Sequence, residues 1–430
     1  MDSIRDRVVT IASLRRPQNQ SEAAEALPEA QTPEALLKQA QYDQIVQRLQ
    51  QAADDVGSDV MVTIPDREVS LAQSKIAEQS TASRPLASGG QEVQFGTGLS
   101  GGDWLRWMWS LTDWVDRKEA HPILRPTVAQ AESLTGDFTV AMAADWGTGL
   151  YGAPKIAEAM RTMAAARKFD LLMHLGDVYY SGTKEETEER FLKMWPADAG
   201  VRNRALNGNH EMYSGGFGYF QLILPAFNQS ASYFALQNEH WVLAGLDTAY
   251  VDHDMDTMQV AWLNLILKQA ELPKRKVVLF SHQQPFSRLD TQGPKLQKAL
   301  QHLLEGRLIT AWYWGHEHQC VLYDQHPAWG LFGRCLGHGG IPEARKAEIK
   351  DAAEDATHPG GAGCTWRRLT PTADSPGCIA LDGPNIDMKK ASDQRKFAPH
   401  GFMTLEFKGP ELVEHVFHSN QTEIYSNTIK

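Results

Sequence analysis

The chain has 430 residues, of which 42% are hydrophobic and 22% are charged, and this balance is typical of a folded protein with a large apolar core. Its 42 basic and 53 acidic residues give a net charge of −11. We therefore expect no general binding to nucleic acid, because that needs an excess of Lys and Arg. The apolar runs are far shorter than the ~20 residues that cross a bilayer, so we expect no membrane span.

The N-terminus and the cysteines bear on the compartment. The N-terminus lacks the apolar segment and small-residue cleavage site of a secretory signal, which predicts a cytoplasmic protein. Four cysteines are too few for a disulfide scaffold, and none forms a CxxC pair. We expect them to be reduced, although a disulfide between Cys364 and Cys378 stays open. The oligomeric state is not predicted.

Residues 1–95, rich in Gln, Ala, Glu and Ser, are expected to be a mostly disordered or helical extension. Apolar residues at helical spacing predict one helix there, over residues 33–56, flanked by disorder. Residues 96–135 hold the end of a linker and a Trp-rich segment. In that segment one helical face carries Trp104, Trp107, Leu111 and Trp114. We expect this helix to pack on the following domain, and the alternative is a platform for a substrate or partner.

From residue 136 to residue 430 we predict one large domain, in which short apolar strands alternate with helices as in an α/β fold. Strands are predicted over residues 138–143, 171–175, 204–206, 233–236, 241–247, 277–281, 308–314, 402–407 and 412–417. Helices are predicted over residues 154–167, 184–194, 259–270 and 296–304. Residues 343–397 show no strong periodicity, so we expect a long inserted loop.

Polar residues able to bind a metal follow almost every predicted strand before residue 320. In an open α/β sheet, ligands bind in the crevice beyond the carboxyl ends of the strands. The segments are Asp145-Trp146-Gly147, Gly176-Asp177-Val178-Tyr179-Tyr180, Asn207-Gly208-Asn209-His210-Glu211, Ser281-His282 and Gly315-His316-Glu317-His318.

Each segment alone has a simpler explanation, such as a turn, a loop cap or a buried histidine. The most suggestive pair is His316 and His318, because a spacing of two residues directs two imidazoles from one strand into the same volume. Taken together, two Asp, a Tyr, an Asn and three His, mostly beside glycines, are the ligand set of a dinuclear metal site.

The order Asp-x-Gly, Gly-Asp-x-x-Tyr, Gly-Asn-His-Glu, strand-end His and Gly-His-x-His resembles the purple acid phosphatases among the calcineurin-like metallophosphoesterases. The resemblance covers residues 137–342 and 398–430. It implies a four-layer sandwich, in which two mixed β-sheets are flanked by helices, preceded here by the helical extension. It also implies that residues 136–430 are a catalytic domain.

The resemblance assigns metal ligands residue by residue. It puts Asp145, Asp177, Tyr180 and His318 on the first metal, with Asp177 bridging to the second. Asn209, His282 and His316 complete the second site. Three anionic ligands suit Fe³⁺ in the first site, and neutral ligands suit a divalent ion, Fe²⁺, Zn²⁺ or Mn²⁺, in the second.

Gly147 is the detail that favours this subgroup. In the wider superfamily the corresponding residue is a histidine ligand, and here Tyr180 would replace it. As a phenolate, Tyr180 needs a strongly charged metal to remove its proton. The alternative is that Tyr179 or Tyr180 only packs and that both metals are divalent.

The expected reaction is hydrolysis of phosphate monoesters, small or macromolecular, by a metal-bound hydroxide. The resemblance gives His210 a catalytic role next to the substrate, as a donor to the leaving oxygen or a stabiliser of the phosphorane, with Asp177 and Asn209 beside it. His338, which lies among glycines, and Gln283 are weaker candidates for substrate contact. Two alternatives stay open: a phosphodiesterase of the same superfamily and an inactive binding or scaffold protein on this fold.

Overall fold

The computed structural model of the chain describes residues 33–57, 60, 62–81, 120–149, 152–166, 169–197, 201–271, 274–358 and 360–430. The chain divides into two compact units, residues 1–119 and 120–430. The Trp-rich segment from Trp104 to Trp114 lies outside the described residues. Within the described ranges, no helix has the length and apolar character needed to cross a membrane.

The described part of the first unit contains two helices, α2 (Pro33–Val56) and α3 (Arg67–Thr81). The first was predicted, but the expectation of a single helix is wrong. The missed helix begins at a capping residue, because the carboxylate of Asp66 accepts a hydrogen bond from the amide of Val69 at 3.0 Å. The two helices share a small apolar cluster of Ile45, Leu49, Ile64, Val69 and Ala72.

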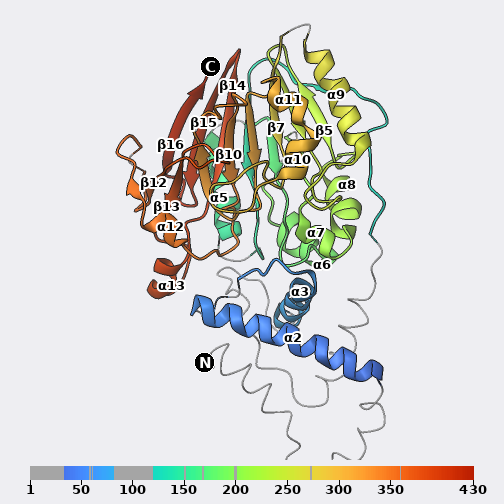
Figure 1. Cartoon of the computed structure of the whole chain (residues 1–430), viewed down its shortest axis with the longest axis vertical. Helices are drawn as coiled ribbons and strands as arrows, with labels where there is room; N and C mark the ends of the chain where they lie inside the picture. The colour runs from blue at the N-terminus through green and yellow to red at the C-terminus, as the bar shows by residue number, and fades with distance from the viewer. Residues whose placement is uncertain are drawn as a thin grey trace, which may run out of the picture. The chain divides into compact units, whose positions relative to one another are not determined.

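The second unit is built on two β-sheets that pack face to face (Figure 1). The ten-stranded sheet has the order β1 (Glu132–Ser133), β5 (Phe234–Gln237), β6 (Trp241–Gly245), β7 (Lys276–Phe280), β8 (Ala311–Trp314), β10 (Phe332–Leu336), β9 (Cys320–Tyr323), β13 (Cys378–Asp382), β12 (Thr365–Leu369) and β11 (Ala353–Glu354). The six-stranded sheet has the order β16 (Glu423–Ile429), β15 (Glu411–His418), β14 (Gly401–Lys408), β2 (Phe138–Ala143), β3 (Leu171–His174) and β4 (Arg202–Ala205).

Helices and single helical turns complete this unit. The longer ones are α5 (Gly152–Ala166) and α9 (Thr257–Glu271). The shorter segments are α6 (Lys184–Glu186), η1 (Thr187–Leu192), α7 (Asn209–Tyr213), η2 (Tyr219–Ile223), α8 (Leu224–Ala226), α10 (Pro294–Ala299), α11 (Gln301–Glu305), α12 (Ala347–Lys350) and α13 (Ala391–Lys396).

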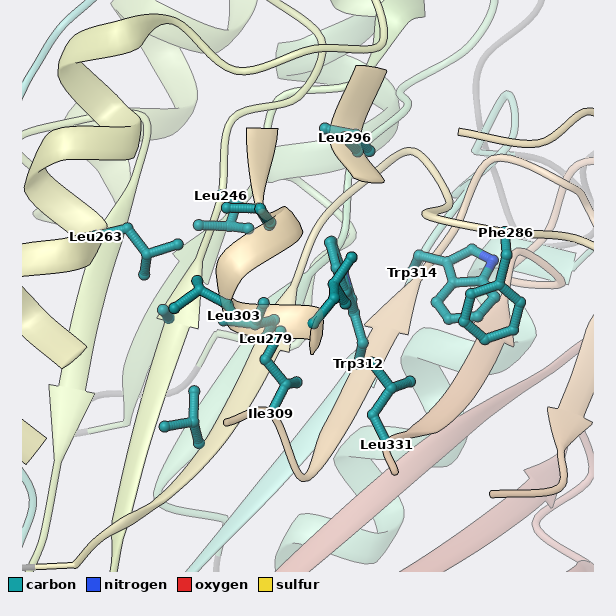
Figure 2. Packing of buried hydrophobic residues seen from close by; sticks show 14 of the residues in the cluster. Leu246, Leu263, Leu279, Phe286, Leu296, Leu303, Ile309, Trp312, Trp314 and Leu331 are labelled. Carbon is teal, nitrogen blue, oxygen red and sulfur yellow. The ribbon is translucent and has the colours of Figure 1, made fainter. Parts of the chain in front are cut away.

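Alternation along the strands produces the layers. In β2, Val140 and Met142 face the core between the two sheets, whereas Ala141 and Ala143 face the outer core that includes α5. The ten-stranded sheet has its own outer core under α9, α10 and α11, in which Leu263, Leu279, Leu303 and Trp312 pack together (Figure 2). The unit is therefore the expected sandwich of two mixed sheets flanked by helices.

A buried ion pair joins the two sheets through their shared core. The guanidinium of Arg334 on β10 donates from Nε to Glu414 Oε1 at 2.8 Å and from Nη2 to Oε2 at 2.9 Å, and Glu414 lies on β15. The hydroxyl of Tyr313 donates to the same carboxylate at 2.7 Å. Because all three side chains are buried, the carboxylate depends on these donors for its charge.

The expectation that residues 343–397 form a long loop is wrong. They contain β11, β12 and β13 together with α12 and α13, and β13 pairs antiparallel with β9, extending the ten-stranded sheet. The strands are short and lie among turns, so their alternation is brief. Cys364 and Cys378 are both buried and unpaired, so the possible disulfide is absent from this structure.

The parallel strands explain where the polar segments meet. Strands β2, β3 and β4 run parallel, and β6, β7 and β8 run parallel in the other sheet. Their carboxyl ends carry the segments that begin near Asp145, Asp177, Asn207, His282 and His316. The fold thus brings together residues from distant parts of the chain, as the backbone amide of His316 donating to Asp145 Oδ2 at 2.9 Å illustrates.

Candidate metal centre

Two groups of metal-ligating side chains share one carboxylate. Asp145, Asp177 and His318 form the first group, and Asp177, His282 and His316 form the second. Within each group one ligand atom per residue lies within 4.8 Å of the others. The arrangement is compatible with two sites bridged by Asp177.

The ligands sit in tight turns directly after the strands. Asp145, Asp177, His316 and His318 all have positive φ angles, of 53°, 68°, 68° and 53°. Such angles are uncommon for residues other than glycine and cluster at functional sites. His316 and His318 follow the end of β8, where we expected the segment to lie, but the turn sends the two rings to different groups instead of directing both into one volume.

The tyrosine of the first group is Tyr179. Its hydroxyl lies 2.9 Å from Asp145 Oδ1, 2.8 Å from Asp177 Oδ2 and 2.6 Å from His318 Nε2. Burial and the two carboxylates raise the pKa of this phenol well above its usual value. A strongly charged cation at the same place would reverse that effect, because it favours the phenolate.

In this structure the hydroxyl of Tyr179 lies beside Asp145 and Asp177, at the place that the resemblance assigned to Tyr180. The backbone of Tyr180 has other partners, since its amide donates to Glu186 Oε1 at 2.7 Å and its carbonyl accepts from Nδ1 of His210. Glu186 also accepts from the amides of Ser181 and Thr183. The Gly-Asp-x-x-Tyr spacing points to Tyr180, whereas the hydroxyl close to the two carboxylates is that of Tyr179.

The backbone conformation and the packing at position 147 explain why a glycine lies there. Its φ angle is +76°, and a Cβ atom there would lie 2.8 Å from the carbonyl carbon and oxygen of Gly340 and 2.9 Å from the amide of Ile341. A histidine at this position would require the backbone around Gly340 to move. Position 147 therefore supplies no side-chain ligand in this packing arrangement.

Asn209 lies beside the second group. Its Oδ1 lies 3.1 Å from His282 Nε2, which is itself 3.2 Å from Asp177 Oδ2. Its Nδ2 donates to the hydroxyl of Tyr213 at 3.0 Å, which fixes the orientation of the amide. The amide oxygen, the better metal ligand, therefore points toward the histidine of this group.

Gln283 supports this group and does not face a substrate in the way we expected. It is fully buried, its backbone amide donates to Thr248 Oγ1 at 3.2 Å, and its side-chain oxygen accepts from the same hydroxyl. Its Nε2 lies 3.4 Å from Asn209 Oδ1. Gln283 thus contacts Asn209, a candidate ligand of the second group.

His210 lies beside the shared carboxylate. Its Nδ1 donates to the Tyr180 carbonyl, which leaves Nε2 directed at Asp177 Oδ2, 3.9 Å away. Its ring packs against Tyr179 and Tyr213 at 4.3 and 4.7 Å between ring centres. Burial lowers its pKa against the opposing charge of Asp177. The ring is thus held in place without being a member of either ligand group.

His338 is placed differently from our expectation. Its ring is buried against Gly401 of β14, and neither ring nitrogen has a hydrogen-bond partner within the described residues. Burial and the nearby His400 and His418 lower its pKa to about 3. A neutral buried ring in this setting is typical of a core histidine and gives no support for contact with a substrate.

Two residues near the site were missed. Glu343 lies with Oε2 3.4 Å from His318 Nδ1, and His253 lies with Nε2 3.3 Å from His316 Nε2. Glu343 opens the segment that we expected to be a loop, and His253 follows β6 in a segment without a recognisable motif. The only signal that could have pointed to His253 is that polar residues follow almost every predicted strand.

The electrostatics of the centre favour a cation. Burial works to raise the pKa of Asp177, but His282 and the other histidines hold it well below its usual range. Against the effect of burial, Asp177 raises the pKa of His282 to about 9, and Asp145 with Glu343 raises that of His318 to about 10. The field at the carboxylates therefore attracts positive charge, which metal ions supply in place of protons. The donor set fits two metal ions.

A two-sheet sandwich with two adjoining ligand groups at its strand ends is the architecture of a metallophosphoesterase. In agreement, residues 138–320 match the family model of the calcineurin-like phosphoesterases. This segment holds all the candidate ligands from Asp145 to His318. This part of the chain therefore resembles a calcineurin-like phosphoesterase domain, a family that binds a dinuclear metal centre.

A solved structure shares this fold. A purple acid phosphatase from seeds of yellow lupin (Lupinus luteus) matches with a TM-score of 0.51 and 15% identity, covering 71% of this chain and 55% of that one. The similarity thus spans about half of the lupin protein and is a similarity of fold. An inner-membrane-complex anchor from Plasmodium matches with a TM-score of 0.47, 10% identity and coverages of 69% and 89%. A dimetal phosphatase from Danio rerio matches with a TM-score of 0.43, 12% identity and coverages of 69% and 99%. No curated protein matches the chain.

Proposed function

We propose that this protein is an acid phosphatase that hydrolyses phosphate monoesters with Fe³⁺ in the first group and Fe²⁺, Zn²⁺ or Mn²⁺ in the second. The observation that carries the proposal is the position of the Tyr179 hydroxyl, within 2.9 Å of both Asp145 and Asp177. A phenolate with two carboxylates gives the first group three anionic donors, which suits a trivalent ion. The second group has only neutral donors besides the shared Asp177.

Two bound metal ions supply Lewis-acid activation of water and of a phosphoryl oxygen. The protein's own contribution is to hold the donors in place. The carboxylate of Asp177 is fixed by the backbone amide of His210, which donates to Oδ1 at 3.0 Å. Glu211 holds the same loop, because its carboxylate accepts from the amides of Asp177, Val178 and Gly208 at 3.0–3.1 Å.

His210 is the residue we propose to act on the substrate. Its Nδ1–H bond to the Tyr180 carbonyl directs Nε2 toward the shared carboxylate, where the phosphate would lie. As an imidazolium, Nε2–H can donate a proton to the leaving alkoxide oxygen or a hydrogen bond to the charge that develops on phosphorus. Neither role requires His210 to bind a metal.

A comparison of monoester and diester hydrolysis tests the proposal. We expect the wild-type protein to hydrolyse p-nitrophenyl phosphate much faster than bis(p-nitrophenyl) phosphate, and Asp177→Ala to lose both activity and metal. Asp374→Ala, at an exposed position in the second unit, is the matched control and should behave like wild type. Faster diester hydrolysis would assign the protein to the phosphodiesterases, and a metal-loaded protein without either activity would support a binding role.

A further inference from the structure

The loop that follows β6 contacts the second ligand group from outside. Residues 247–254 lead from the core to His253, whose Nε2 lies 3.3 Å from Nε2 of His316, with the two rings nearly perpendicular at 80°. The loop has a defined shape. Asp247 Oδ1 accepts from the amide of Tyr250 at 3.0 Å, and Val251 and Asp254 form a bridge around the turn that presents His253.

The two ring nitrogens of His316 face different partners. Its Nδ1 lies 3.3 Å from His282 Nε2, on the side of the second ligand group. Its Nε2 faces the ring of His253. When Nδ1 of an imidazole binds a metal, the neutral ring carries its proton on Nε2. That proton then needs an acceptor, and His253 Nε2 is at the right distance.

Asp252, the residue before His253, determines which nitrogen of the His253 ring can accept. His253 Nδ1 lies 2.8 Å from Oδ1 of Asp252, so the proton of the neutral His253 ring belongs on Nδ1 and its Nε2 is free to accept. The sequence of contacts therefore runs from Asp252 through His253 to His316. In metal sites, a partner on the remote nitrogen of a ligating histidine fixes its tautomer and ring orientation.

We propose that His253 is a positioning residue for the second metal, which holds His316 in the ligating tautomer and orientation, with Asp252 orienting His253 in turn. The inference rests on the proposed function only in requiring a metal in the second group. The same loop also reaches the amide donor of that group, because Thr248 contacts Gln283 and Gln283 contacts Asn209. The loop thus supports both His316 and Asn209.

Two amide variants of His253 distinguish the loss of its ring contact with His316 from a change in the fold of the loop. His253 has a φ angle of +60°, a conformation that asparagine tolerates well, so His253→Asn should keep the turn. Its side-chain oxygen stands near the position of Nδ1 and is too short to reach His316. In His253→Gln the amide oxygen stands near the position of Nε2, so this variant restores an acceptor for the His316 proton.

The measurement is the retention of each metal in protein loaded with two metals and dialysed against increasing EDTA, with metal content determined by mass spectrometry. We expect His253→Asn to lose the second metal at ~10–100-fold lower chelator concentration than wild type, because loss of such an outer partner costs about that much affinity. His253→Gln should recover most of the difference. Asp252→Asn should give a smaller loss in the same direction, because Asp252 is largely exposed. The first metal should be unaffected throughout.

The control is His302→Asn, an exposed histidine of α11 that contacts Asn264, and it should match wild type. Wild-type retention in His253→Asn, or an equal loss in His253→Asn and His253→Gln, would overturn the positioning role, since the second result would show a general loop effect. A wild-type protein that binds only one metal would instead contradict the proposed function, whatever the His253 variants do.

Discussion

The hydroxyl of Tyr179 lies 2.8 Å from Oδ2 of Asp177, the one carboxylate that both ligand groups share. It also lies 2.9 Å from Asp145, so a phenol and two carboxylates converge on one place beyond the strand ends. Gly147, two residues after Asp145, has no room for a side chain. We infer that the tyrosine supplies the donor that the glycine cannot.

If His210 acts on the substrate without binding a metal, its removal should lower the turnover number and leave the metal content unchanged. We expect His210→Ala to reduce kcat by ~10²–10⁴-fold, the usual contribution of a proton donor, while both metals stay bound. The measurements are steady-state kinetics with a phosphate monoester and metal content on the same samples. If kcat stays at the wild-type value, His210 has no catalytic role, and if metal is lost with it, the residue is a ligand or a support for one.

Replacing Gly147 should be more destabilising than a positive φ angle alone would predict. A left-handed conformation costs a non-glycine residue ~1–2 kcal/mol. Gly136→Ala, at φ +59° with nothing within 4 Å of the new Cβ, isolates this cost. Gly147→Ala adds the contact with the Gly340 backbone, for which we expect a further ~1–3 kcal/mol. Urea unfolding of the metal-free proteins measures both, and equal values would contradict the packing argument.

The ion pair between the sheets should respond strongly to removal of one partner. Glu414→Gln leaves the Arg334 guanidinium buried without its counter-charge, and we expect a loss of ~3–5 kcal/mol in the free energy of unfolding. The double variant Arg334→Met, Glu414→Gln removes the stranded charge, while the new amide oxygen can still accept from Tyr313, so it should recover part of that loss. Chemical denaturation of the three proteins gives the comparison, and a double variant no more stable than Glu414→Gln would contradict it.

Buried neutral histidines should make the fold acid-sensitive. Burial, helped by His400 and His418, lowers the pKa of His338 from 6.5 to about 3. Below pH 6.5 His338 binds a proton in the unfolded chain but stays neutral in the folded chain. The contribution of His338 to the free energy of unfolding is therefore fully present above pH 6.5 and falls as the pH drops toward 3. The slope for one such histidine is ~1.4 kcal/mol per pH unit.

The His338→Gln variant should therefore show a shallower loss of stability between about pH 6 and about pH 4, by about one proton, than the wild-type protein. His302→Gln, at an exposed position, should leave the wild-type slope unchanged. The measurement is urea unfolding at a series of pH values within that window. An unchanged slope in His338→Gln would mean that this ring is protonated in the folded state.

Short apolar runs that end in distinctive polar segments made most strands and the candidate ligands predictable. Asp145, Asp177, Asn209, His282, His316 and His318 are all brought together at the strand ends. The Gly-Asp-x-x-Tyr spacing pointed to Tyr180, whereas the hydroxyl that lies beside the two carboxylates is that of Tyr179.

Features that depend on packing between distant parts of the chain could not be predicted from the sequence. Strands β12 and β13 carry too few alternating residues to stand out, and their place is set by pairing with β9. His253 and Glu343 belong to no motif, because each contacts a candidate ligand rather than joining a ligand group. Helix α3 begins at a capping Asp66 that, without the partner helix, is one polar residue among many.

The most direct test of the account combines metal content with the visible absorption spectrum for wild type, Tyr179→Phe and Tyr180→Phe. We predict about one iron and one further metal per chain in wild type, and a tyrosinate-to-iron absorption band that disappears in Tyr179→Phe and persists in Tyr180→Phe. Two divalent metals without such a band, or a band lost only in Tyr180→Phe, would contradict the assignment of Tyr179 to an Fe³⁺ site.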